Sequence, residues 1–332
     1  TSAVAFANDG TLTLGQDGGT QTYNAGLTTT SVGSTVTLNG TIATSNDAVV
    51  LGAVTLGSAT TIDTNATDTT GDITIAAITG GSNNLTLSTG DNIANTDITA
   101  SGAISGLGNL TLADVGGTAT FSANVAAAAL SAANTVANIT FTGSTNTFSA
   151  ASTLANDGTL TFGDATGDSF TFNGGLTTSS VGGTVTLNTS ISSSNDVLTF
   201  GAITLGNNVT IDTNASSTTG DLTIGAVTGG SNTLTLSTGD NVANTDISAS
   251  GAISGVTTLT LSDVGGTATL SGDVDVTTLT VGSTVANLAF TGNGSSVTSA
   301  VAFANDGTLT LGASGGTQTY NAGLTTTSVG ST

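Results

Sequence analysis

The residues that this sequence does not contain set the first limits on its function. The 332 residues include no Lys, Arg, His, Glu, Pro, Cys, Met or Trp, and all 21 acidic residues are Asp. Without cysteine, the chain has no disulfide framework and no thiolate metal site. Without histidine and glutamate, most zinc sites and most acid–base or nucleophilic triads cannot be assembled. The composition therefore predicts that the protein is not an enzyme.

The charge of the chain has one sign only. The formal net charge is −21, and no cationic side chain pairs with the carboxylates. A phosphate backbone would be repelled, so nucleic acid is not an expected partner, whereas cations would be attracted. No apolar run approaches the roughly 18 to 20 residues that cross a bilayer, so no membrane span is expected.

The restricted alphabet does not indicate disorder. Hydrophobic residues make up 37% of the chain, and Leu, Val and Ile recur at regular places among many Thr, Ser, Ala, Asn and Gly. Disordered chains lack such aliphatic residues. The composition favours a folded, β-rich chain.

A long repeat organises the sequence. Residues 1–35 recur at 298–332 with changes at only two positions, 16 and 17. Between these copies, the phrases IDTNA, LTLSTGDN and DVGGTAT each occur twice with the same spacing. Neither end resembles a capping element, so we expect a fragment of a longer repetitive protein.

This repeat predicts one continuous solenoid over residues 1–332. Its expected parts are the end of a preceding repeat at 1–10, long repeats at 11–158 and 159–307, and a partial third repeat at 308–332.

A shorter period lies inside each long repeat. The phrase Thr-Leu-Thr-Leu at residue 11 returns in variants at steps of 24, 24, 25, 25, 29 and 21, and then of 25, 24, 25, 25, 29 and 21. Such a period is typical of coils in a β-solenoid. The sequence thus predicts an all-β fold, a parallel β-solenoid (β-helix) with about 25 residues per coil and about 13 coils.

Each copy of this phrase predicts one strand. Polar and apolar residues alternate, so Leu12 and Leu14 are expected to point inward while Thr11 and Thr13 point outward. Each large residue buried per coil contributes about 1.5 to 3 kcal/mol. The expected interior column is Leu14, Leu38, Ile62, Leu87, Leu112, Phe141, Phe162, Leu187, Ile211, Leu236, Leu261, Phe290 and Leu311.

One stretch favours a helix by composition. SANVAAAALSAAN at 122–134 is rich in Ala, the best helix former. Its counterpart at 271–283, SGDVDVTTLTVGS, alternates as a strand does. Because homologous repeats share a fold, we predict strands in both.

These features resemble a group of secreted bacterial proteins. Threonine-rich anchors, about 25 residues per coil and frequent GG, NG and DG turns are similar to filamentous-haemagglutinin-like adhesins, autotransporter passengers and giant surface repeat proteins. The resemblance implies a right-handed, three-faced β-helix, an extracellular or bacterial cell-surface location, and a role in adhesion or in a fibre. The GGxGxD motif of calcium-binding nonapeptide repeats is missing.

Aspartates recur at one place in successive coils, and they are the candidate metal ligands. Two interpretations stay open: a column of carboxylates about 4.8 Å apart that binds a cation such as Ca²⁺, or solvated turn residues that splay apart. The residues concerned are Asp47, Asp72 and Asp97, and in the second copy Asp196, Asp221 and Asp246.

The outward threonines also have two interpretations. A regular threonine array is similar to the ice-binding face of some β-solenoid antifreeze proteins. Threonine also has high β-propensity and stacks well on itself. Residues such as Ala59, Asn84 and Asn109 interrupt the first outward position, which argues against a double-threonine face.

The function that follows is structural. We predict an extracellular protein that forms a fibre, sheath or surface layer and associates with copies of itself, head to tail or laterally. The alternatives are the stalk of a cell-surface adhesin with its binding tip outside this sequence, and an ice-binding solenoid.

Overall fold

The computed structural model describes residues 2–90, 93–239, 242–327 and 330. All regular secondary structure in these residues is β-strand, so the predicted all-β fold is confirmed. The Ala-rich stretch forms β12 (Val125–Ala132) and its counterpart forms β30 (Val274–Val281), so both are strands as predicted. In the described part of the chain, no helix is long and apolar enough to span a membrane.

The chain divides into two units, and each is described by itself. The first unit comprises Thr1–Gly163 with Ser180–Gly183, and the second comprises Asp164–Ser179 with Thr184–Thr332. The strands of the first unit are β1 (Val4–Ala5), β2 (Leu12–Leu14), β3 (Thr20–Tyr23), β4 (Leu27–Thr28), β5 (Val36–Thr44), β6 (Val49–Asp63), β7 (Ile73–Thr79), β8 (Leu85–Ser88), β9 (Ile98–Ala100), β10 (Ile104–Ala113), β11 (Val115–Phe121), β12, β13 (Val136–Phe141), β14 (Thr145–Phe148), β15 (Ser152–Leu154) and β16 (Leu160–Phe162).

The second unit is built in the same way. Its strands are β17 (Ser169–Phe172), β18 (Leu176–Thr177), β19 (Val185–Leu187), β20 (Ser190–Ser192), β21 (Leu198–Phe200), β22 (Ile203–Leu205), β23 (Val209–Asp212), β24 (Leu222–Ile224), β25 (Val227–Thr228), β26 (Thr233–Ser237), β27 (Ile247–Ala249), β28 (Ile253–Ser262), β29 (Val264–Leu270), β30, β31 (Val285–Phe290), β32 (Ser296–Val297), β33 (Val301–Phe303), β34 (Leu309–Leu311), β35 (Thr319–Tyr320) and β36 (Leu324–Thr326).

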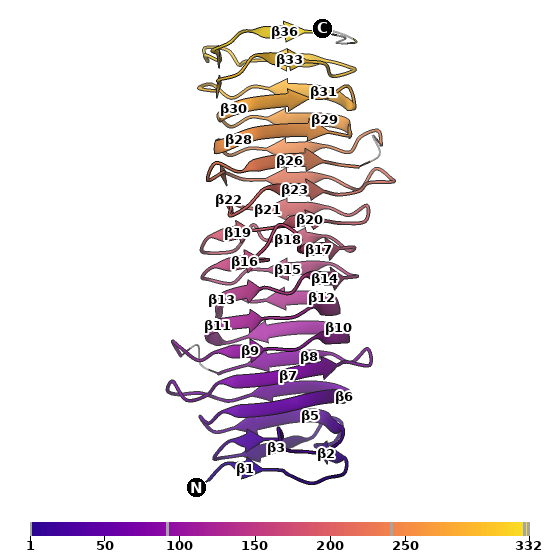
Figure 1. Ribbon diagram of the computed structural model, residues 1–332, viewed down its shortest axis with the longest axis vertical. Coiled ribbons are helices and arrows are strands. Elements are labelled where there is room, and N and C mark those ends of the chain that lie inside the picture. The colour runs from indigo at the N-terminus through magenta and orange to yellow at the C-terminus, as the bar shows by residue number, and fades with distance from the viewer. Residues whose placement is uncertain (1, 91–92, 240–241, 328–329, 331–332) are drawn as a thin grey trace. The chain divides into compact units, whose positions relative to one another are not determined.

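Within each unit, strands of successive turns pair in parallel, like rungs (Figure 1). In the first unit, one column of paired residues is Val4, Leu27, Val49, Ile73, Ile98, Ala119, Ile139 and Leu160. In the second unit, a column is Phe170, Ile191, Ile211, Leu236, Leu261, Val281, Phe303 and Thr326. Between successive members of a column the chain passes through all three faces, which confirms the parallel β-solenoid.

The predicted interior column is wrong at four steps, which are Leu38 to Ile62, Leu112 to Phe141, Leu187 to Ile211 and Leu261 to Phe290. The first residue of each step pairs with another residue, namely Leu56, Ala132, Leu205 and Val281 in that order. Leu38 pairs with Leu56 and not with Ile62, which lies further along the chain; Ile62 pairs with Ile42 on another face. The expected coil of about 25 residues does separate paired residues elsewhere. Ile62 pairs with Leu87, and Leu87 pairs with Leu112. At the step from Leu38, the difference arises because β6 runs through three faces in 15 residues without a loop. Polar and apolar residues alternate in the same way on every face, so this pattern could not show which face a given phrase occupies.

The long repeat is not a whole number of turns. Leu12 pairs with Val36, whereas its repeat equivalent Leu160 pairs with Ile139, in the column that begins at Val4. Between Leu12 and Leu160, the chain makes six complete turns and then continues over two further faces. The equivalent phrases at Leu12 and Leu160 therefore lie on different faces of the first unit.

This register can be tested by cysteine crosslinking, because the native chain contains no cysteine. Thr37 and Thr55 are register partners, so Thr37→Cys with Thr55→Cys should form a disulfide on mild oxidation, since paired strands lie about 4.8 Å apart. The control is Thr37→Cys with Thr61→Cys. The coil period in the sequence predicts that these two residues are neighbours, but the structure does not, so this pair should stay reduced. Gel mobility of oxidised protein distinguishes them, and efficient crosslinking of the second pair would overturn the register.

The interior is packed with large apolar side chains. Phe121, Phe141 and Phe162 are fully buried and stack on one another, with ring centroids 4.9 and 5.9 Å apart and interplanar angles of 14° and 8°. The ladder places these rings directly in register. Burial in the second unit raises the pKa of Tyr320 to about 12.

The outward positions form hydroxyl rows. One row in the first unit follows a single face through six turns, and it is Thr41, Thr61, Thr86, Thr111, Ser131 and Thr153. In the second unit a double row runs over three turns, with Thr233 and Thr235, Thr258 and Thr260, and Thr278 and Thr280 in register. The double row is limited to these three turns, because Asn208 precedes Thr210 in the turn before them, which is one of the interruptions that the sequence indicates.

Candidate functional site

Two of the three predicted aspartates in each repeat lie in neighbouring turns. The Asp97 amide donates to Asp72 Oδ1 at 2.8 Å, and the Thr118 amide donates to Asp97 Oδ1 at 2.7 Å. The second unit repeats this, with the Asp246 amide 2.9 Å from Asp221 Oδ1 and the Thr267 amide 2.7 Å from Asp246 Oδ1. Each carboxylate satisfies a backbone N–H of the next turn at a corner where the strand ladder stops.

The third aspartate of each repeat is out of register. Val49 pairs with Ile73, so Asp72 stands opposite Ala48 and Asp47 is displaced by one residue. The same holds for Asp196, because Leu198 pairs with Leu222 and leaves Asp221 opposite Val197. A displacement of one residue in extended chain reverses the side-chain direction. The structure therefore brings together Asp72 with Asp97 and Asp221 with Asp246, but not Asp47 or Asp196.

Asparagines perform the same task at other corners. Asn84 Oδ1 accepts from the Asn109 amide at 2.8 Å, and Asn208 Oδ1 accepts from the Thr233 amide at 2.9 Å. Asn138 Oδ1 accepts from both the amide and the hydroxyl of Thr159, each at 2.9 Å. The side-chain oxygen, which Asp and Asn share, is what these positions use.

A loop in each repeat extends this network. Asn46 Oδ1 accepts from the amides of Thr67 and Asp68 at 2.6 and 2.8 Å. Asn195 Oδ1 accepts from Ser216 and Ser217 in the second unit. Hydrogen bonds from the Thr70 hydroxyl, from the Asn46 side chain and from the Thr70 amide hold the pKa of Asp68 below its usual value. Asn46 and Asn195 both have positive φ, of 73° and 76°, which Asn tolerates better than most residues.

Buried hydroxyls line the inner side of the same corner. Thr64 Oγ1 donates to the carbonyls of Gly71 and Thr89, at 2.5 and 3.1 Å. Thr89 Oγ1 donates to the Asp114 carbonyl at 2.9 Å and shares a hydrogen bond with Thr96 Oγ1. Thr213 and Thr238 repeat these contacts in the second unit. The corner is therefore held by hydroxyl bonds inside and carboxylate or amide bonds outside.

The carboxylates offer few ligands for a metal ion. Within the described residues, no three Asp side chains are grouped so that they could hold one ion. Asp72 and Asp97 each use Oδ1 for a backbone N–H, which leaves Oδ2 of each for a cation, whereas Ca²⁺ takes six to eight oxygen ligands. Calcium binding stays a prediction, and on this geometry most of the ligands would be water.

The role of these carboxylates can be tested by substitution. Asp72→Asn keeps the Oδ1 acceptor, so we expect the free energy of unfolding to change by less than about 0.5 kcal/mol. Asp72→Ala removes the partner of the Asp97 amide and should cost about 0.5 to 1.5 kcal/mol. The control is Asp17→Ala, at an exposed position where the later copy of this segment carries Ser314. Urea unfolding followed by circular dichroism measures all three, and an equal cost for Asn and Ala would contradict the acceptor role.

A shallow hollow recurs on the surface of both units. In the first unit it is lined by residues 82, 106–108, 126–128, 147 and 149, and in the second by residues 231, 255–257, 275–277, 296 and 298. Every lining position of one hollow is separated from its counterpart in the other by one long repeat. The hollow is therefore a property of the long repeat, and the sequence pattern did not predict it.

A β-bulge produces the hollow. The register shifts between Ile104 and Leu107 of β10, where the chain takes one residue more than β12 does, and it shifts in the same way between Ser254 and Val256 in β28. Gly106 and Gly255 sit in the bulges with φ of 62° and 68°, a region that favours glycine. Because these glycines have no side chain, the backbone forms the floor of the hollow between the outward-pointing side chains on either side.

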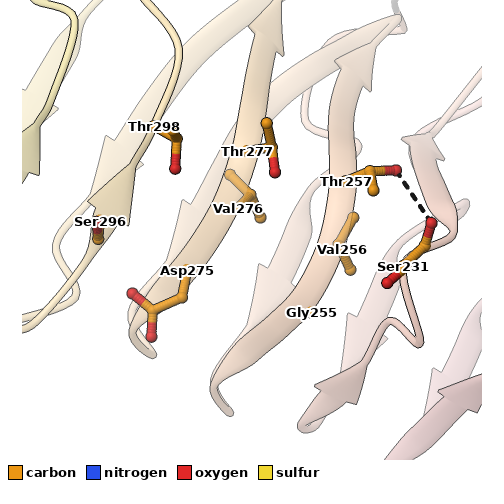
Figure 2. Close-up of a pocket in the computed structure, with 9 residues that line it drawn as sticks. All are labelled: Ser231, Gly255, Val256, Thr257, Asp275, Val276, Thr277, Ser296 and Thr298. Carbon is orange, nitrogen blue, oxygen red and sulfur yellow. Dashed lines mark hydrogen bonds between the residues drawn. The ribbon is translucent and has the colours of Figure 1, made fainter.

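The linings of the two hollows differ in chemistry. Gly108, Ala126 and Ala128 of the first are replaced by Thr257, Asp275 and Thr277 in the second. The smaller side chains leave about 550 Å³ in the first hollow, against about 460 Å³ in the second. Figure 2 shows Thr257, Thr277 and Thr298 in a row across the strands of the second hollow, with Asp275 and Ser296 on the row beside them.

No protein-family model, curated protein or solved structure matches the chain.

Proposed function

We propose that the chain is part of a structural extracellular protein, located at a bacterial cell surface, that forms a fibre, sheath or surface layer from stacked solenoid repeats. The observation that carries this proposal is the in-register parallel pairing of successive turns in each unit, combined with a sequence that repeats its opening segment almost unchanged. Such a chain lengthens by adding repeats, because each turn needs only its two neighbours.

The partner that fits this proposal is another copy of the same protein. Many residues of the outward rows are Thr, Ser and Ala, whose small side chains allow neighbouring sheets to pack closely. Carboxylate repulsion opposes association, so cations should promote it by screening. A specific calcium effect would persist at matched ionic strength and would be lost in Asp72→Asn with Asp221→Asn.

Electron microscopy and fibre diffraction of the native material test the structural role. We expect uniform filaments, tubes or layers with a strong reflection at about 4.8 Å along the solenoid axis, from the spacing of successive turns. Material that contains only separate, non-assembling particles would overturn the proposal. A globular ligand-binding domain at the end of isolated stalks would instead favour the adhesin alternative.

The ice-binding alternative has one observation in its favour, the double threonine row of the second unit. It covers three turns only, and thermal hysteresis of the purified chain would be the result that supports this alternative.

A further inference from the structure

We propose that the hollow at β28, β30 and β32 is a binding site for a polyol that carries a protonated amine, such as an amino sugar. This inference is independent of the structural role, because it concerns one surface feature of the second unit. The two hollows have equivalent positions but different lining residues. A difference in binding between them would therefore come from the lining residues and not from the shape.

The second hollow collects polar groups that the fold does not use. The carboxylate of Asp275 and the hydroxyls of Thr277, Ser296 and Thr298 line it and have no hydrogen-bond partner within the described part of the chain. Neighbouring polar groups do have structural partners: Asp273 Oδ1 accepts from the Gly294 amide at 2.7 Å, and Thr278 Oγ1 donates to Ser299 Oγ at 3.3 Å. The hollow therefore brings together four polar side chains that have no partner in the described part of the chain.

These groups face one space from adjacent strands. Asp275 pairs with Ser296, and the register continues so that Thr277 stands beside Thr298 (Figure 2). Thr257 completes the row, and its hydroxyl already donates to the Asn232 carbonyl at 3.1 Å, which leaves its oxygen free to accept. The arrangement offers hydroxyl donors and acceptors along one side and a carboxylate on the other.

The chemistry of a ligand follows from these partners. A row of hydroxyls matches a ligand with several hydroxyls of its own, because each can both donate and accept. A carboxylate in a chain of net charge −21, which contains no cationic side chain, selects a cationic group and excludes an anionic one. The hollow is shallow, with a volume of about 460 Å³, so a ligand would lie across the strands with one face in solvent.

The first hollow is the natural control. It has the same bulge and a larger volume, but Ala126 stands where Asp275 does, and Gly108 and Ala128 stand where two threonines do. If the lining chemistry determines binding, the first hollow should not take the ligand.

Titration of isotope-labelled protein with D-glucosamine, followed by amide chemical shifts, tests the proposal. We expect saturable shifts at residues 275–277 and 296–298, with none at residues 126–128. D-Glucose and ammonium chloride, at matched ionic strength, should each bind at least about tenfold more weakly, because each offers only half of the recognised groups.

Two reciprocal variants make the test decisive. Asp275→Ala installs the residue that the first unit carries and should weaken glucosamine binding at least about tenfold without unfolding the strand. Ala126→Asp with Ala128→Thr should create shifts at the first hollow. Unchanged binding in Asp275→Ala, or shifts spread over all the Asp-bearing corners, would show non-specific counterion association and overturn the site. Binding of ammonium as tight as that of glucosamine would overturn the polyol component.

Discussion

Phe141→Ala should lower the free energy of unfolding of the first unit by about 3 to 5 kcal/mol. The Phe141 ring is fully buried between Phe121 and Phe162, and its removal leaves a cavity that neither ring can fill, because both are held in register by the ladder. The loss includes two ring contacts in addition to the apolar area. This makes it the largest single-residue effect that we expect in this unit.

Two variants calibrate this expectation. Phe6→Ala removes a ring that is only half-buried and makes one edge contact, with Tyr23 at 6.4 Å, so it should cost less than half as much. Phe141→Leu should also cost less than Phe141→Ala, because leucine leaves a smaller cavity than alanine does. Urea unfolding by circular dichroism compares the three, and an equal cost for Phe6→Ala and Phe141→Ala would contradict the stack as a centre of stability.

The sequence predicted the solenoid because two independent periodicities agreed. Alternation of Leu with Thr requires a strand with one buried face, and its recurrence over many phrases requires stacked turns. The structure confirms both, and it confirms strands in the Ala-rich stretch, where burial of Ala127 and Leu130 outweighs helix propensity.

The sequence could not assign each phrase to a face. Leu38, Leu56 and Ile62 follow the same alternation, and only the length of chain between corners decides that Leu38 pairs with Leu56. Whether a turn is short or long depends on whether its corners are tight bends, as in β6, or loops. No local pattern distinguishes these two cases.

The candidate site depended on register in the same way. Asp47, Asp72 and Asp97 are nearly equivalent by spacing, yet one residue of displacement separates Asp47 from the other two. The hollow was missed because its cause, the bulge at Gly255, is one glycine among 47. A partial signal was present: the replacement of Ala126 and Ala128 by Asp275 and Thr277 is a change of chemistry at matched positions of the two repeats.

Thr64→Val should lower the free energy of unfolding by about 1 to 3 kcal/mol, although valine has nearly the same shape. The Thr64 hydroxyl is fully buried and donates to the carbonyls of Gly71 and Thr89. The substitution removes this donor from the Gly71 carbonyl inside the corner, whereas the Thr89 carbonyl keeps its hydrogen bond from the Ala66 amide at 2.7 Å. Thr213 makes the same two contacts in the second unit, so Thr213→Val should have the same effect there.

The matched control for Thr64→Val is a threonine of the adjoining strand, β6. Thr61 is half-buried in the outward row, where valine fits a strand as well as threonine does, so Thr61→Val should change stability by less than about 0.5 kcal/mol. Thermal and urea unfolding of both variants separate an inward hydroxyl that holds a corner from an outward one that does not. If Thr61→Val and Thr64→Val were equally destabilising, the cost would come from a general loss of threonine, and the inner hydroxyls would have no special role in joining one turn to the next.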